Sequence, residues 1–270
     1  MFALFSAVFQ ALGQVSSAQS ARKFGVAPTL AFASLTASIV VASVFGLFGT
    51  DKSVSLVSGT LAGLAGLVGL LVLLAAFRKI AVAVASAVVA ASSAIVISGW
   101  DLLNGSQASA TQFSALVLCL ASLALLFKVT DNRSFGSGAL LAVLAGAAFG
   151  TYVIYLSFSP SGQLELGTLL VARVVIATPI CLFVLIQNCS KKSSLNAPRL
   201  AFFSGAMDAA GNLFLLLALQ FDNLLLVGTM AAVVPVISGA IAAIGLREKL
   251  NTRQIVALCV AVAGAALAAI

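Results

Sequence analysis

Long apolar runs, joined by short polar connections, constrain the fold of this chain more than any other feature. Each run is about 20 residues long, the length that an α-helix needs to cross a hydrocarbon core of about 30 Å. Charged residues are only 8% of the chain, whereas a soluble domain has about 25%. The sequence therefore predicts an all-α integral membrane protein with ten transmembrane helices, at about residues 2–20, 28–49, 55–77, 80–100, 109–128, 137–157, 167–188, 200–220, 224–245 and 253–270.

Residue usage excludes several function classes. The net charge is +7, but the basic residues stand singly or in pairs in short connections, so we expect no nucleic-acid partner. The sequence has no His and no clustered pair of acids, which argues against an enzyme. The cysteines, Cys119, Cys181, Cys189 and Cys259, lack paired spacing and are interpreted as packing residues. We expect neither a metal nor a cofactor.

The basic residues also predict an orientation in the membrane. Cytoplasmic connections carry an excess of Lys and Arg. Twelve basic residues fall in alternate connections, whereas Lys52 falls on the other side and Arg173 lies within a helix. The twelve are Arg22, Lys23, Arg78, Lys79, Lys128, Arg133, Lys191, Lys192, Arg199, Arg247, Lys249 and Arg253. Their positions predict that these connections are cytoplasmic and that both termini are extracytoplasmic.

The two halves of the chain resemble each other. Shifted by 142 residues, the glycine pattern from Gly63 to Gly69 falls on Gly205 to Gly211. Shifted by 140, Ala115 to Leu120 falls on Ile255 to Val260. We therefore expect two five-helix repeats, residues 1–133 and 134–270, within one membrane domain. An odd number of helices per repeat forces opposite orientations, as in many secondary transporters.

Asp208 is the leading candidate for a functional residue. A charged group at the centre of a membrane helix costs about 2.5–3.5 kcal/mol on insertion scales, so it is expected to have a role. Asn212 lies one turn further on the same face, and Arg173 is the only basic residue within a predicted helix. From the helical rise, Arg173 and Asp208 are expected at levels about 10 Å apart. The alternatives are substrate recognition or proton coupling, and an ion pair that only orders the helices.

Other residues are candidates for the same cavity or for its movement. Gln10 and Gln14 belong to a polar stripe with Ser6 and Ser17 along the first helix, which predicts either cavity lining or interhelical hydrogen bonds. Tyr152 and Tyr155 in the sixth helix either contact the substrate or anchor the helix at the interface. Pro235 and Pro179 lack a backbone donor, so each is expected to kink its helix and to act in gating.

The second half carries a recognisable pattern. It comprises Thr229 to Ile237 with Pro235 inside, Gly245-Leu246-Arg247-Glu248-Lys249-Leu250 followed by Thr252 and Gln254, and Arg173 at the start of the seventh helix. With Gly205, Asp208 and Asn212, it resembles an EamA-like transporter of the drug/metabolite transporter superfamily. The first half departs from the pattern, since Ser93 stands where Pro235 would be and the glutamate is missing.

The resemblance implies a secondary active transporter that moves a small polar or amphiphilic metabolite by alternating access. Export of an amino acid or a related compound is the first expectation, possibly coupled to protons through Asp208. We expect a cavity lined by the first, third, fourth, sixth, eighth and ninth helices, and a bacterial plasma (inner) membrane location. The expected partners are a small-molecule substrate and the lipid bilayer, with the protein a monomer or homodimer. The alternatives are a lipid or polyprenyl-phosphate flippase and a membrane subunit that transports nothing.

Overall fold

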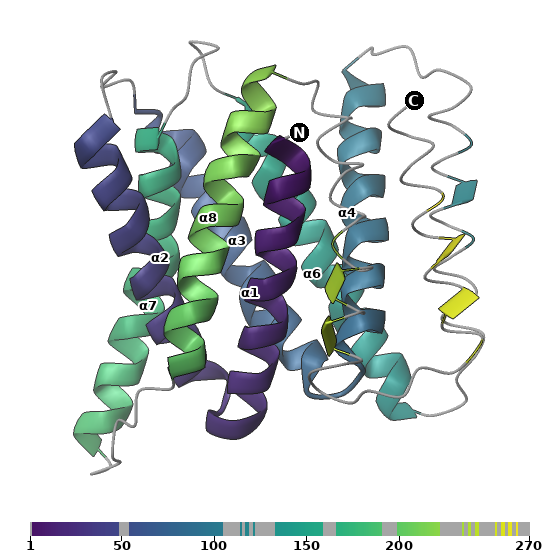
Figure 1. Ribbon diagram of the computed structural model, residues 1–270, viewed down its shortest axis with the longest axis horizontal. Coiled ribbons are helices and arrows are strands. Elements are labelled where there is room, and N and C mark those ends of the chain that lie inside the picture. The colour runs from purple at the N-terminus through teal and green to yellow at the C-terminus, as the bar shows by residue number, and fades with distance from the viewer. Residues whose placement is uncertain are drawn as a thin grey trace.

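The computed structural model describes seven helices and, within the described residues, no strand (Figure 1). The helices are α1 (Phe2–Phe24), α2 (Val26–Phe48), α3 (Leu56–Phe77), α4 (Val82–Leu103), α6 (Arg133–Ser157), α7 (Leu166–Ser190) and α8 (Arg199–Phe221). The described residues are 2–48, 54–104, 133–158, 166–190 and 199–221, with 114, 117–118, 121, 234, 237–238, 241–242, 252, 255–256, 259–260 and 263. The expected helices at 109–128, 224–245 and 253–270 otherwise lie outside them.

Six of these helices are long and apolar enough to cross a membrane. They are α2, α3, α4, α6, α7 and α8, which makes the chain an integral membrane protein. The remaining helix, α1, is 23 residues long but has a lower mean hydropathy, because its sequence contains Gln10, Gln14 and Gln19. Its length agrees with the prediction of a first helix, while its composition indicates a helix that needs polar neighbours.

The helix ends follow from local sequence. Between α1 and α2 a single residue, Gly25, adopts φ 94°, a left-handed conformation that glycine tolerates better than other residues. Its backbone N–H donates to the carbonyl of Ala21 at 3.0 Å, which closes α1 and lets α2 turn back at once. At the start of α3, the Ser55 hydroxyl accepts from the backbone N–H of Ser58 at 3.3 Å and caps the helix.

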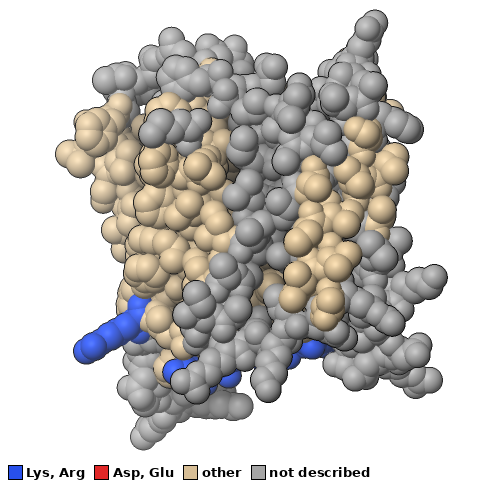
Figure 2. Space-filling model, turned by 45° about the vertical axis from the view of Figure 1, so that its right-hand side comes forward, with Lys and Arg blue, Asp and Glu red and all other residues tan. Residues whose placement is uncertain are grey.

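The described basic residues outside the bundle interior gather at one end of the molecule. Arg22 and Lys23 end α1, Arg78 and Lys79 follow α3, and Arg199 begins α8. On the face shown in Figure 2, the blue Lys and Arg side chains lie in the lower part. We call this the basic end and the opposite one the far end. Because the two ends differ in charge, the bundle has a defined polarity across the membrane.

The helices pair in an order that differs from their order in the chain. The most extensive contacts join α1 to α8 and α3 to α6, and α4 also packs on α6. In addition, α2 contacts α7 and α8, and α3 contacts α7, whereas α1 touches α3 and α4 only sparsely. Sequence neighbours such as α3 and α4 thus make few contacts with each other. The fold is held together mainly by contacts between distant segments.

Close helix approach is made possible by glycines, as at Gly63 of α3. A Cβ atom at Gly63 would lie 2.6 Å from Cβ of Val175 and 2.8 Å from the carbonyl oxygen of Ala172, both in α7. Small residues let helix backbones approach in a membrane, where van der Waals packing drives association. Gly59 also lies against α7, since a Cβ atom there would be 2.9 Å from Cβ of Val171.

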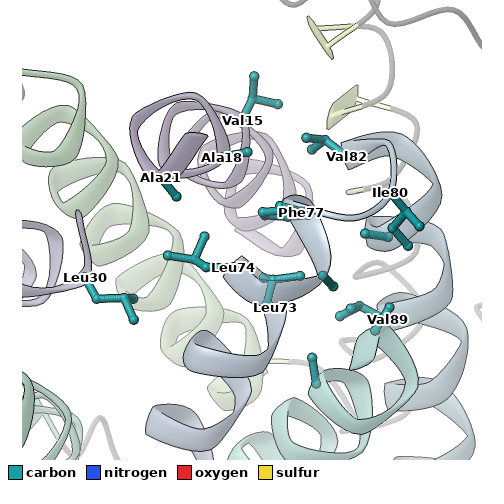
Figure 3. Packing of buried hydrophobic residues seen from close by; sticks show 14 of the residues in the cluster. Val15, Ala18, Ala21, Leu30, Leu73, Leu74, Phe77, Ile80, Val82 and Val89 are labelled. Carbon is teal, nitrogen blue, oxygen red and sulfur yellow. The ribbon is translucent and has the colours of Figure 1, made fainter. Parts of the chain in front are cut away.

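The largest buried apolar cluster joins helices near the basic end (Figure 3). From α3 it contains Leu73, Leu74 and Phe77, and the end of α1 contributes Val15, Ala18 and Ala21, with Leu30 from the start of α2. By contrast, Ala3, Ala7 and Ala11 of α1 belong to smaller clusters with α8 and Val234. The last ten residues of α1 therefore connect it to α3, and its first half does not.

Candidate functional site

A cavity of about 140 Å³ lies in the middle of the bundle. All seven described helices and Val234 contribute to its wall. Most of its lining is apolar, with polar side chains from every described helix except α3. The expected lining omitted the second and seventh helices. In the structure Leu30, Ala33 and Ser34 of α2 and Arg173 and Ile176 of α7 also line the cavity, and α2 and α7 pack against each other.

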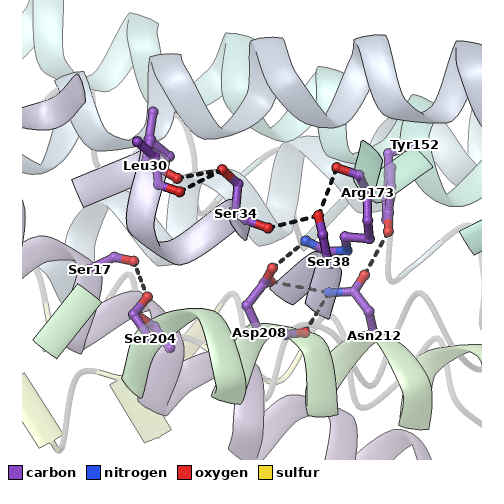
Figure 4. A network of polar contacts seen from close by, with 11 residues as sticks. Ser17, Leu30, Ser34, Ser38, Tyr152, Arg173, Ser204, Asp208 and Asn212 are labelled. Atoms are coloured by element: carbon purple, nitrogen blue, oxygen red, sulfur yellow. Dashed lines mark hydrogen bonds and ion pairs between the residues drawn. The ribbon is translucent and has the colours of Figure 1, made fainter. Parts of the chain in front are cut away.

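The Arg173 guanidinium and the Asp208 carboxylate form a direct ion pair at this cavity (Figure 4). Nη1 of Arg173, in α7, donates to Oδ2 of Asp208, in α8. The two side chains differ in exposure, at 3% for Arg173 and 32% for Asp208. Removing one partner of a buried pair leaves an uncompensated charge, so each group stabilises the other. The pair also places a partly accessible carboxylate on the cavity wall.

Asn212 and Tyr152 extend the ion pair into a network. One turn beyond Asp208, Nδ2 of Asn212 donates to the carboxylate Oδ1 at 3.1 Å and to the backbone carbonyl of Asp208 at 2.8 Å. The hydroxyl of Tyr152, in α6, donates to Oδ1 of Asn212 at 2.8 Å. Both side chains are buried. Three helices, α6, α7 and α8, thus fix the orientation of the Asp208 carboxylate.

Ser38 of α2 is part of this network although the sequence did not indicate it. Its hydroxyl donates to the carbonyl of Ser34 at 2.8 Å and to the backbone carbonyl of Arg173 at 3.2 Å. A serine in a membrane helix usually bonds within its own helix, so its type and position gave no signal. The contact ties α2 to the turn of α7 that carries Arg173.

The guanidinium of Arg173 keeps unused donor capacity. Its Nε is buried and has no hydrogen-bond partner among the described residues. A buried donor without a partner costs about 1–3 kcal/mol and calls for an explanation. Arg173 also lines the cavity, so this unsatisfied donor belongs to a residue of the cavity wall.

Gln10 and Gln14 of α1 lie on the same cavity. Nε2 of Gln10 donates to the Ser6 hydroxyl at 3.0 Å, and that hydroxyl donates to the carbonyl of Gly211 at 2.8 Å. Oε1 of Gln14 accepts from the Ser86 hydroxyl of α4 at 2.9 Å. Gln14 therefore bonds to a neighbouring helix and also lines the cavity, whereas Gln10 lines the cavity and bonds within α1.

Two of the predicted residues lie elsewhere. Tyr155 is half-buried outside the cavity lining, and its ring centroid is 6.0 Å from that of Phe158. Pro179 lies inside α7 with its side chain exposed, away from the cavity. Pro235 is outside the described residues. The structure thus brings together Asp208, Asn212, Arg173, Tyr152, Gln10 and Gln14, and separates them from Tyr155 and Pro179.

The chemistry of the wall is that of an amphiphilic binding site. A carboxylate and a guanidinium stand side by side, and donors and acceptors of amide groups lie on the α1 side. Apolar side chains such as Phe149, Val89 and Leu70 form much of the remainder. Pockets of this composition bury the apolar part of a ligand and fix its orientation with a few polar groups.

Comparison with known proteins gives a family and a fold. The model of the EamA-like transporter family matches residues 136–270. Twenty-eight chains of solved structures are similar to this one. One of them, described only as the crystal structure of a protein, has 17% sequence identity and a TM-score of 0.65, over 98% of this chain and 96% of that chain. At that identity the likeness concerns the fold alone. No curated protein matches the sequence.

Proposed function

Because the chain belongs to the EamA-like transporter family, we propose that it is a secondary active transporter exporting an amino acid or a related small amphiphilic metabolite. Membership in this family makes it a membrane transporter of the drug/metabolite type. The proposed mechanism is alternating access, in which a central site opens to one side of the membrane at a time. The substrate class, the direction and the mechanism are argued below from the described helices.

The helix pairings support an arrangement of two inverted five-helix repeats, residues 1–133 and 134–270. In this arrangement α1, α2 and α3 correspond to α6, α7 and α8, respectively. The α1–α8 pairing then corresponds to the α6–α3 pairing, and the α2–α8 pairing corresponds to the α7–α3 pairing. The two pairings in each comparison have contacts of similar extent, and α2 contacts α7 directly. In addition, α1 runs from the far end to the basic end, while α6 runs the opposite way (Figure 1). Pairings of this kind are expected of inverted repeats related by a two-fold axis.

The Arg173–Asp208 pair at the cavity wall is the observation that carries the proposed substrate class. A zwitterion can exchange its own charges with such a pair, because its ammonium replaces the guanidinium at Asp208 while its carboxylate accepts from Arg173. Nε of Arg173 is already free to donate. No net charge is then buried, which avoids most of the desolvation penalty of an unpaired ion. The apolar remainder of the cavity would hold the rest of the solute.

The same pair disfavours a flippase of anionic lipids. An anionic head group would have to compete with Asp208 for the guanidinium, and it would leave the carboxylate without its partner. A zwitterion satisfies both groups at once. Labelled lipids and polyprenyl phosphates therefore belong in the substrate panel as the comparison class, alongside amino acids.

Transport by purified protein in liposomes tests the proposal. Asp208→Asn keeps the shape of the side chain and removes its charge, and we expect transport of the zwitterion to fall at least about tenfold, equivalent to about 1.4 kcal/mol. Transport that is unchanged in Asp208→Asn, with or without a pH gradient, would contradict a role for Asp208 in binding and in proton coupling. Loss of the pH-gradient effect alone would assign Asp208 to coupling.

A double variant separates function from scaffolding. Arg173→Met leaves Asp208 without its partner, and breaking a buried pair in this way costs about 3–5 kcal/mol. Combining it with Asp208→Leu replaces the pair by apolar side chains, and we expect the thermal unfolding midpoint in detergent to recover. Transport should stay absent in the double variant. Recovery of both stability and transport would show that the ion pair only orders the helices.

A further inference from the structure

The described helices divide into two groups by their contacts. In the first group α1 and α2 each pack on α8, and in the second group α3 and α4 each pack on α6, with α3 also on α7. Hydrogen bonds such as Ser6 to Gly211 and Ser204 to Gly13 join helices within the first group. Each group contains helices from both halves of the chain. Contacts between the groups are sparse except along α2 and α7.

The two groups meet near the basic end, at the part of the cavity wall that faces this end. We call this part of the wall the floor of the cavity. Leu30 of α2 and Leu73, Leu74 and Phe77 of α3 line the cavity and also belong to the largest buried cluster. Phe77 is the last residue of α3, and its ring is 1% exposed. These side chains therefore fill the space between the cavity and the basic end where α1, α2 and α3 converge.

Arg22 spans the two groups at this floor. From the last turn of α1, its Nε and Nη2 both donate to the backbone carbonyl of Phe77, at 3.2 and 3.1 Å. The N–H groups of Lys79 and Ile80 donate to the carbonyl of Ala76 instead. A cation at a helix C-terminus also interacts favourably with the helix dipole. The guanidinium thus holds the end of α3 against the end of α1.

We propose that Arg22 holds the cytoplasmic gate closed, and that its hydrogen bonds to the Phe77 carbonyl break whenever the cavity opens at the basic end. We call this contact the latch. This inference rests on the proposed transport function. Opening at the basic end requires the floor to part. Among the described residues, α1 joins the second group there through apolar contacts, the Ser86–Gln14 hydrogen bond and the charge-assisted bonds of Arg22 to the Phe77 carbonyl. The motion then separates two groups of helices drawn from both repeats, with α2 and α7 as the line of contact between them.

Cysteine labelling tests the latch without any substrate. In a variant whose four cysteines are replaced, Ala90→Cys serves as the reporter, because Ala90 lines the cavity and is 6% exposed. A membrane-impermeant maleimide is added from the side on which Lys23→Cys reacts, since Lys23 is exposed at the basic end. We expect slow labelling of the reporter in the presence of Arg22 and about tenfold faster labelling in Arg22→Ala.

Two further variants make the result specific. Lys23→Ala removes the same charge one residue away and is expected to leave the labelling rate unchanged. Arg22→Lys keeps one donor and should give an intermediate rate, because an ammonium lacks the fork of the guanidinium. The proposal would be overturned if the reporter were labelled at the same rate with Arg22 and with Arg22→Ala. It would also be overturned if Lys23→Ala raised the labelling rate as much as Arg22→Ala. Should Arg22→Ala fail to fold, Arg22→Gln is judged by the same criterion.

The outcome is independent of the proposed substrate. Labelling reports access to the cavity, so it stays informative if no amino acid is transported. Conversely, an unchanged labelling rate together with transport that depends on Asp208 would remove the latch and keep the transport proposal.

Discussion

At the scale of single residues, the bundle contains two kinds of polar group, and the ion pair at the cavity belongs to the second kind. Serine hydroxyls such as those of Ser34 and Ser92 are satisfied by carbonyls of their own helix and need no partner helix. Arg173, Asp208, Asn212 and Tyr152 depend on one another across three helices. Their placement is therefore a tertiary property, and a change at one of them is transmitted to the others.

The tyrosine hydroxyl of this network provides a residue-scale prediction. Tyr152→Phe removes the bond to Asn212, and because interhelical bonds in membranes contribute about 0.6 kcal/mol and at most about 1.7, we expect a loss of that size. The thermal unfolding midpoint in detergent measures it. Tyr155→Phe is the matched control and should be neutral, since Tyr155 lies outside the cavity lining. Equal effects of the two substitutions would argue that the bond does not matter.

The sequence was informative about charged residues and less so about the others. Asp208 and Arg173 were identifiable because a membrane helix tolerates few charges, and the structure joins them directly. The offset of about 10 Å expected from helical rise left open whether the two side chains would meet directly. Ser38 and Arg22 could not be found in this way. A serine in a helix and a basic residue at a helix end are common, and only the fold shows what they contact.

At the scale of the elements, α1 combines a low mean hydropathy with a central position. Ser6 bonds to α8, Gln10 bonds to Ser6 and Gln14 accepts from α4, so these polar groups are satisfied although the helix lies inside the bundle. The sequence predicted both its helical nature and its polar stripe. It did not predict α8 as the partner, because apolar segments of similar composition give no signal for which helices pair.

Helix packing gives the prediction at this scale. Gly63→Ala introduces a Cβ within 2.6–2.8 Å of α7, and overpacking of this kind costs about 1–3 kcal/mol. Gly99→Ala in α4 is the control, since a Cβ there meets no described residue within 4 Å and alanine favours the helix. Chemical denaturation or thermal unfolding of the two variants should therefore shift the stability in opposite directions. A neutral Gly63→Ala would refute the close approach of α3 and α7.

At the scale of the whole molecule, the distribution of charge predicts the orientation. The basic end carries Arg22, Lys23, Arg78, Lys79 and Arg199, which the positive-inside rule assigns to the cytoplasm. In intact bacterial cells we expect Lys23→Cys to be protected from a membrane-impermeant maleimide. Leu103→Cys, at the far end of α4 and 86% exposed, should react. Reaction of Lys23→Cys from outside alone would reverse the assignment and place both termini in the cytoplasm.

The pairing of α1 with α8 also has a consequence for how the protein is made. A ribosome must add every residue from Gly25 to Pro198 after finishing α1 before it begins α8, which takes roughly 10–35 s at 5–20 residues per second. During that delay the nascent α1 lacks the helix whose Gly211 carbonyl accepts from Ser6. The translocon or an insertase must shelter its polar side from lipid until then. The first helix of this transporter therefore gains its main packing partner only late in synthesis.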